Sequence, residues 1–122
     1  MRTLKILEDF RNPEGRKNVY VAIVLGEWTG VEVHASSHKR AAELFYHHIT
    51  GLYEVGSTIG GQTRKSIEKD FTAVEIQTAS SQNSKFFKYD YWIGTKDHRE
   101  KFRDYAVKTL PDAYHKIYGG SK

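Results

Sequence analysis

Five segments of the chain have the hydrophobic patterns of β-strands, either an alternation of apolar and polar residues or a short, nearly continuous apolar run. These segments cover 3–10, 19–26, 31–36, 71–79 and 85–94. The segment 19–26, VYVAIVLG, is almost continuously apolar, which is typical of a strand in the middle of a sheet. Turn-forming residues occupy 11–18 and 80–84, and EWTG at 27–30 is predicted to be a hairpin turn.

Two other segments repeat their apolar residues every three or four positions, which predicts helices. The first begins at Ser36 or Ser37, either of which can cap it, and ends at Gly51. The second begins at Thr95 and stops or kinks at Pro111. The apolar side of the first helix collects Ala41, Leu44, Phe45, His48 and Ile49. The apolar side of the second collects Phe102, Tyr105, Ala106 and either Thr109 or Leu110.

The order of these elements is βββ-α-ββ-α. It predicts an α+β fold in which an antiparallel sheet of about five strands carries two helices on one face. The chain of 122 residues is expected to form a single domain, 1–122. The segment 52–70 has no clear period and is expected to be a connection of mixed character.

The amino-acid composition excludes several classes of site. The chain contains no cysteine, which excludes disulfides, thiolate nucleophiles and cysteine-ligated metal clusters. No apolar run reaches the roughly 18 residues that a membrane helix needs, and the charged start MRTLKILEDF does not resemble a signal peptide. We therefore expect a cytoplasmic protein without a membrane partner. The net charge of +4 is compatible with a ligand that carries phosphate.

The stretch GGQTRKS, at 60–66, combines two glycines, two hydroxyl residues and two cations, as phosphate-binding loops do. A Walker-type loop needs glycine directly before its lysine, whereas here Arg64 precedes Lys65, and that class is excluded. A looser anion site is still compatible with the stretch if Thr63 or Ser66 starts a short helix. The alternative is a solvated polar loop.

A basic and aromatic surface is the strongest candidate. The segment 85–94 is expected to direct Phe87, Tyr89, Tyr91 and Ile93 to one side, and Phe86, Lys88, Asp90 and Trp92 to the other. The final helix repeats Lys96, Arg99 and Arg103 along one stripe. Cations neutralise phosphates and aromatic rings stack on bases, so the combination indicates nucleic-acid or nucleotide binding. The predicted ligand-binding residues are Arg64, Lys65, Lys88, Tyr91, Trp92, Arg99 and Arg103.

The motifs that would indicate a catalytic or metal site are less complete than the basic and aromatic surface. His48 lies on the apolar arc and is predicted to be a core histidine, and no set of histidines has the spacing of a metal site. Asp70, Glu75 and Gln77 are a loose match to the carboxylates of a metal-dependent nuclease. The segment 91–105 resembles the second half of the GIY-YIG nuclease motif at Tyr91, Gly94 and Arg99, but the first half of that motif is absent upstream.

The sequence therefore predicts a small binding module, without catalysis or cofactor, whose partner is nucleic acid or a nucleotide. The same surface also suits a protein–protein interaction or inhibitor module, including one of viral origin, or the contact of a homo-oligomer, because tyrosine, tryptophan and arginine dominate such contacts. A metal-dependent nuclease is the third alternative.

Overall fold

A computed structural model describes residues 4–9, 15–51, 57–68, 70–91, 97–110 and 112, without the side chains of 57, 58, 89–91, 97 and 98. Its elements, in chain order, are β1 (Lys5–Glu8), β2 (Asn18–Val24), β3 (Glu27–Ala35), α1 (His38–Thr50), β4 (Ser57–Gln62), α2 (Arg64–Ile67), β5 (Ala73–Thr78), β6 (Ser84–Tyr91) and α3 (Asp97–Thr109). Thr95 and the start predicted for the last helix lie outside the described residues.

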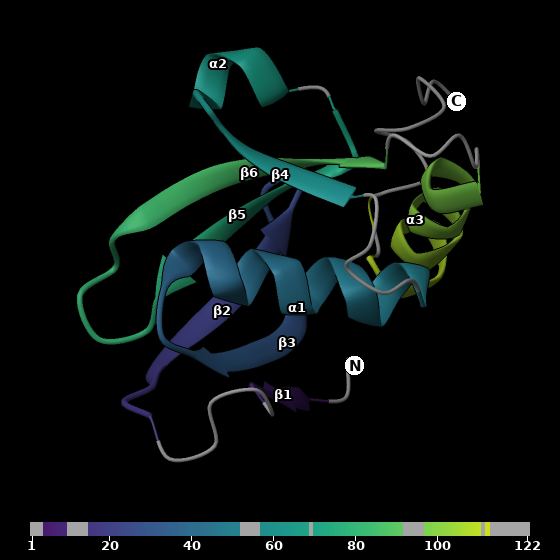
Figure 1. Ribbon diagram of the computed structural model, residues 1–122. Helices are drawn as coiled ribbons and strands as arrows, with labels where there is room; N and C mark the ends of the chain where they lie inside the picture. The colour runs from purple at the N-terminus through teal and green to yellow at the C-terminus, as the bar shows by residue number, and fades with distance from the viewer. Residues whose placement is uncertain are drawn as a thin grey trace.

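The strands form one mixed sheet in the order β1-β3-β2-β5-β6-β4 (Figure 1). β1 runs parallel to β3, while the other neighbouring pairs are antiparallel. The α+β class is confirmed, but the purely antiparallel sheet of about five strands is corrected. β3 lies between β1 and β2, parallel to the first and antiparallel to the second, so β1 is the strand that makes the sheet mixed.

The sixth strand and a third helix come from the segment that was expected to be a mixed connection. β4 pairs with β6 from Ser57 opposite Tyr91 to Gln62 opposite Phe86. Periodicity missed this strand because STIGGQ holds a single large apolar residue. α2 follows at once, and the Thr63 side chain caps it by accepting a hydrogen bond from the Ser66 N–H. A short helix that starts at Thr63 was the condition under which the sequence allowed an anion site at GGQTRKS, and the structure has that helix.

The β2–β3 hairpin turns at Leu25 and Gly26, both of which have positive φ, as the tight turns of hairpins require. The turn predicted at 27–30 is therefore wrong, because β3 already begins at Glu27. The register between the two strands shifts at Val21 and Ile23. There the buried Thr29 hydroxyl donates to the Ala22 carbonyl at 2.7 Å, which satisfies a backbone group at the irregularity.

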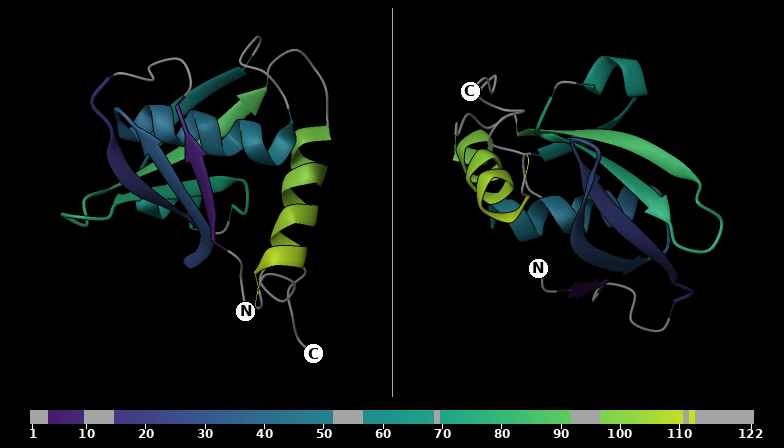
Figure 2. Two further views of the ribbon diagram at one scale, coloured as in Figure 1. Left: turned by 90° about the horizontal axis from the view of Figure 1, so that it is seen from below. Right: turned by 180° about the vertical axis from the view of Figure 1, so that it is seen from behind.

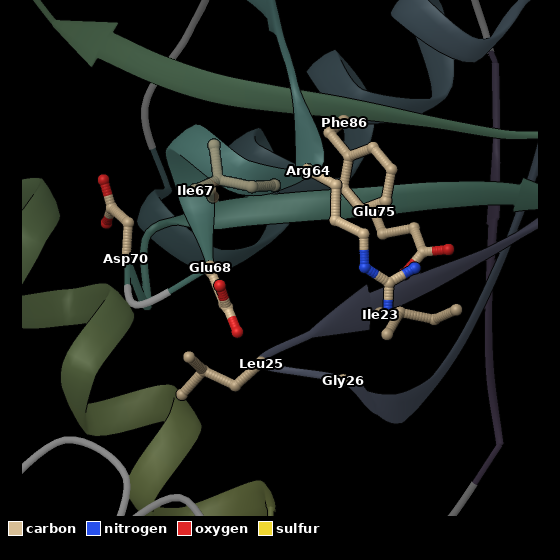
Figure 3. Close-up of a pocket in the computed structure, with 10 residues that line it drawn as sticks. Ile23, Leu25, Gly26, Arg64, Ile67, Glu68, Asp70, Glu75 and Phe86 are labelled. Atoms are coloured by element: carbon tan, nitrogen blue, oxygen red, sulfur yellow. The ribbon is translucent and has the colours of Figure 1, made fainter.

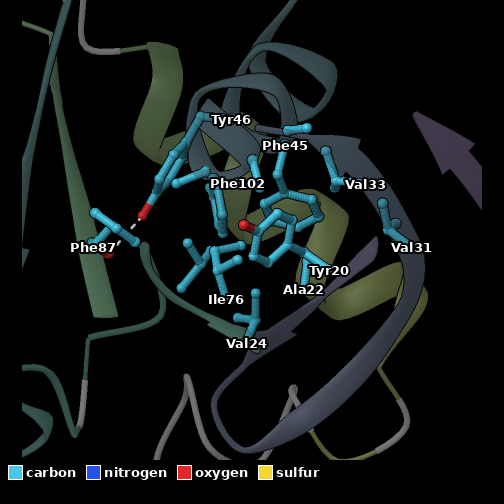
Figure 4. Close-up of a cluster of buried hydrophobic side chains, with 14 of the residues drawn as sticks. Tyr20, Ala22, Val24, Val31, Val33, Phe45, Tyr46, Ile76, Phe87 and Phe102 are labelled. Atoms are coloured by element: carbon cyan, nitrogen blue, oxygen red, sulfur yellow. Dashed lines mark hydrogen bonds between the residues drawn. The ribbon is translucent and has the colours of Figure 1, made fainter. Parts of the chain in front are cut away.

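The core lies between the sheet and the helices (Figure 4). Alternate strand residues supply it, as the two-residue period predicts, and the buried strand residues are Tyr20, Ala22, Val24, Val31, Val33, Ala35, Val74, Ile76 and Phe87. At its centre the buried Tyr46 hydroxyl lies 2.6 Å from the Thr72 carbonyl and 2.9 Å from the Phe87 carbonyl. This hydroxyl joins α1 to the residue before β5 and to the middle of β6.

α1 lies across one face of the sheet (Figure 1). Ser37 caps its start by accepting from the Arg40 N–H, and Gly51 ends it in the left-handed conformation, as predicted. Its buried residues are Ala41, Ala42, Phe45, Tyr46 and Thr50. The prediction of a core His48 is wrong, because that side chain is exposed at the edge of the helix. The buried arc is rotated by about one residue from the arc that the sequence indicated.

α3 packs across the C-terminal end of α1 (Figure 2). Phe102 is fully buried and contacts Tyr46 with ring centroids 5.4 Å apart. Ala106 and Leu110 join the same core, which α3 reaches by packing against α1. Lys101 donates from Nζ to the Thr50 carbonyl at 3.0 Å and so ties α3 to the last turn of α1.

Candidate functional site

The sheet face directed away from α1, called the outer face from here on, carries a hollow beneath α2 (Figure 3). Its volume is about 180 Å³. Three strands reach it through Ile23 of β2, Ala73 and Glu75 of β5, and Phe86 of β6. These residues follow from the register, since Ile23 lies opposite Glu75 and Glu75 opposite Phe86. The remaining lining residues are Leu25, Gly26, Arg64, Ile67, Glu68 and Asp70.

Apolar and charged groups divide this hollow between them. Ile67 is almost fully buried and covers the side of the hollow formed by α2. Arg64, from the same turn of helix, extends its guanidinium toward the Glu75 carboxylate (Figure 3). Glu68 points toward Leu25 from the opposite side of the hollow. Three carboxylates and one guanidinium therefore line one small hollow together with apolar side chains.

Asp70 is the most constrained of the three carboxylates. Its Oδ1 accepts from the Thr72 N–H at 2.9 Å and from the Thr72 hydroxyl at 2.6 Å. Its Oδ2 lies 3.2 Å from Lys88 Nζ. Burial alone would raise the pKa of Asp70, but these hydrogen bonds and the ammonium charge outweigh it and lower the pKa below its ordinary value. Asp70 is therefore a structural anion whose charge Lys88 balances.

Exposed apolar side chains lie on the outer face beyond the hollow. Trp28 lies opposite Ile23 and is 42% exposed, and Val19 on the same strand as Ile23 is 38% exposed. Acidic groups lie among them, with Glu32 opposite Val21. An aromatic and aliphatic surface next to a charged hollow is suited to contact with another macromolecule.

A second, shallower hollow of about 460 Å³ lies where β4 passes into α2. GGQTRKS and the start of β6 meet here, through Gly61, Gln62, Thr63, Arg64, Ser84, Lys85, Phe86 and Phe87. These described lining residues include two cations and two hydroxyl groups, and none of them is a carboxylate. The motif and the aromatic strand, which the sequence considered separately, are neighbours.

The basic surface predicted from sequence is largely paired with other groups. Lys88 contacts Asp70, and Arg103 Nε lies 3.9 Å from Asp104. The Arg99 guanidinium lies 5.1 Å from the centroid of the Phe71 ring, a cation–π contact.

The other predicted ligand-binding residues have different positions. Arg64 lines both hollows, and Lys65 is exposed on α2. Tyr91 ends β6, and its side chain falls outside the described residues, as does Trp92. The structure thus brings Arg64 and the neighbourhood of Lys88 to one end of the outer face, and places Arg99 and Arg103 on α3.

Sequence reasoning missed Trp28, Glu68 and the hollow itself. Trp28 was assigned to a turn, whereas β3 begins at Glu27, four residues before the predicted strand, and pairs Trp28 with Ile23. Glu68 reaches the hollow only because α2 folds over the sheet, which no local pattern signals. Asp70 and Glu75, the nuclease candidates, do line one hollow, but the described residues contain no group of three side chains able to hold a metal ion.

No helix in the described part of the chain is long and apolar enough to cross a membrane. Comparison with known protein families, curated proteins and solved structures finds no match to this chain.

Proposed function

We propose that the protein is an interaction module whose outer face binds another protein, with a lysine or arginine side chain of the partner entering the hollow beneath α2. The observation that carries this proposal is the composition of the hollow. It joins apolar walls to more carboxylates than cations, and the exposed Trp28 lies beside it, opposite Ile23. The proposal develops the protein-interaction alternative drawn from the sequence.

Size favours a side chain over a free ligand. The hollow of about 180 Å³ is smaller than the roughly 300–1,000 Å³ typical of small-molecule sites. It matches the volume of one long side chain. Ile23, Ile67 and Phe86 would contact the aliphatic stem of such a residue, as apolar walls commonly do for lysine and arginine.

Charge selects the sign of that side chain. Lys88 balances Asp70, and Arg64 points toward Glu75, so Glu68 is the carboxylate in excess. A cation entering between Glu68 and Glu75 would be attracted to both. The surrounding exposed tryptophan and aliphatic residues are the types that dominate the binding energy of protein interfaces.

Synthetic peptides test this proposal. A peptide with lysine between apolar residues is titrated against the protein and followed by NMR shifts, beside the same peptide carrying norleucine or glutamate. We expect the lysine peptide alone to shift Ile23 and Ile67, and Glu68→Gln to weaken it roughly tenfold, the value of a charge-assisted contact. Glu100→Gln, an exposed change on α3, is the matched control. Equal binding of the norleucine peptide would refute the proposal.

A second candidate is the phosphate-bearing ligand, nucleic acid or nucleotide, that the sequence predicted. The shallow hollow favours it, since Lys85 and Arg64 meet Thr63, Ser84 and the Phe86 ring there. Glu75→Gln separates the two proposals by sign. It removes a carboxylate that attracts the lysine peptide, yet releases Arg64 for a phosphate. Lys85→Glu should abolish nucleotide binding, and binding that does not fall with salt would contradict this second candidate.

A further inference from the structure

The outer edge of β1 carries backbone groups that β3 does not use. The Asp9 N–H donates to the His34 carbonyl at 3.1 Å, so the polar groups of Asp9 point toward β3. Because strand residues alternate, those of Leu7 and Lys5 do the same, and those of Ile6 and Glu8 point away from the sheet. β1 is the terminal strand, and no hydrogen bond to these outward groups occurs within the described residues.

The side chains next to this edge are also exposed. Leu4 and Ile6 lie on the outer-face side of the strand and are 50% and 52% exposed. On the opposite side of the strand, a groove of about 520 Å³ runs between β1 and α1. The α1 residues that line it are Leu44, His47 and His48. An edge with free backbone groups and apolar flanks is a template for a further strand.

We propose that this edge pairs with β1 of a second copy of the chain, antiparallel and centred on Ile6, so that two sheets join into one. With a two-fold axis perpendicular to the sheet, even-numbered residues of β1 lie opposite even-numbered residues of the second copy, and odd-numbered opposite odd-numbered. Only such pairs direct their side chains to the same face of the joined sheet. Ile6 opposite Ile6 of the second copy is the pairing in which every outward N–H and C=O meets its counterpart. Leu4 then lies opposite Glu8 of the second copy.

Charge selects the antiparallel direction. β1 carries its cation, Lys5, near the start and its exposed carboxylate, Glu8, at the end. In the antiparallel register Lys5 lies opposite Leu7 and Glu8 opposite Leu4 of the second copy, so each charge is kept away from its own copy, whereas in-register parallel pairing would place like charges side by side. Lys5 and Leu7 of the second copy would then lie against the groove formed with α1, and the two Ile6 side chains would meet on the outer face.

The cysteine-free chain allows a direct test of register, since an introduced thiol is the only one present. Hydrogen-bonded antiparallel partners have Cα atoms about 5.5 Å apart, within reach of a disulfide. Ile6→Cys should therefore cross-link rapidly under mild oxidation. Lys5→Cys places the two thiols roughly 8 Å apart along the same edge and should not. Val19→Cys, exposed on an inner strand, controls for random collision.

The unmodified chain should show twice its monomer mass in native mass spectrometry and analytical ultracentrifugation, increasingly so as concentration rises. Ile6→Pro removes an outward N–H without touching a bond to β3, and should weaken the dimer at least tenfold. If Ile6→Pro fails to fold, the cysteine variants decide. A monomer at every soluble concentration overturns the proposal, and so does Lys5→Cys cross-linking as fast as Ile6→Cys.

Discussion

Replacing Tyr46 by phenylalanine measures how strongly one hydroxyl joins α1 to the sheet. The side chain is fully buried, and its hydroxyl lies 2.6 Å from the Thr72 carbonyl and 2.9 Å from the Phe87 carbonyl (Figure 4). The change keeps the ring and its contact with Phe102 at 5.4 Å. No cavity larger than an oxygen atom is created, so the loss reports the hydrogen bonding alone.

The expected cost follows from burial. A typical hydrogen bond contributes about 1 kcal/mol, and leaving a buried partner unsatisfied costs about 1–3 kcal/mol. Two buried carbonyls lose the same donor here, so we expect Tyr46→Phe to lower the free energy of unfolding by about 2 kcal/mol. For a chain of this length that corresponds to a decrease of about 8 °C in the melting temperature.

Urea unfolding followed by circular dichroism measures the difference, with the slope m checked for constancy. Tyr20→Phe is the matched control. Tyr20 is equally enclosed, but among the described residues its hydroxyl hydrogen-bonds to the partly buried Asn18 Nδ2 alone, at 3.3 Å, so its loss should cost less than about 1 kcal/mol. If Tyr46→Phe costs no more than Tyr20→Phe, the hydroxyl does not hold α1 to the sheet, and the core argument fails.

Three further predictions concern pH and backbone satisfaction. The pKa of Asp70 is lowered in the fold, so its stabilisation is present above 3.8 and is lost as the pH falls through the lower folded value; Asp70→Asn should therefore destabilise at neutral pH and approach the unmodified protein in acid, as urea titrations across that range would show. The exposed His48 ring still lines the groove between β1 and α1, and partial desolvation there, together with the neighbouring Lys5, lowers its pKa. Protonation therefore opposes folding, and stability should fall as the pH drops below 6.5; His48→Gln should remove this component, and Lys5→Met should raise the pKa of His48 in an NMR titration. Thr29→Val keeps the shape of the buried side chain but leaves the Ala22 carbonyl without the 2.7 Å hydrogen bond, and should cost about 1–3 kcal/mol in thermal unfolding.

Sequence patterns predicted those features that depend on neighbouring residues in the chain. The ends of α1 could be predicted because each depends on one residue, Ser37 at the start and Gly51 at the end. The buried faces of β5 and β6 followed from the two-residue alternation of their side chains. β4 could not be predicted from the sequence, because its glycines interrupt the alternation of apolar and polar residues and because it is a strand only through its pairing with β6. The parallel β1 was missed because direction depends on which strand it meets, and that strand lies more than 20 residues away.

The candidate site also depends on contacts between residues that are distant in the sequence. The sequence shows which residues are basic, but it does not show which groups from other elements they contact. Lys88 meets Asp70 across the turn before β5, and Arg99 meets Phe71 from a separate helix. Lys88 is thus neutralised by a carboxylate, whereas Arg99 keeps its charge and packs on an aromatic ring. The hollow beneath α2 depends on the register of three strands and the position of a helix of one turn, and no segment encodes it alone.

Strand twist decides whether the proposed dimer and the proposed binding hollow influence one another. The hollow is centred near β5, and seven strand steps separate it from its copy across paired β1 edges in the order given by the sheet. Neighbouring strands rotate by roughly 20–25°, so the two hollows would differ in direction by about 140–175°. One partner chain of ordinary length would not bridge them.

Ile6→Pro should therefore leave the affinity for the lysine peptide unchanged, and a tandem peptide should bind the dimer no more tightly than a single one does. A gain for the tandem peptide that disappears in Ile6→Pro would show that the joined sheet is flatter than sheet geometry allows, or that the chains meet through another surface.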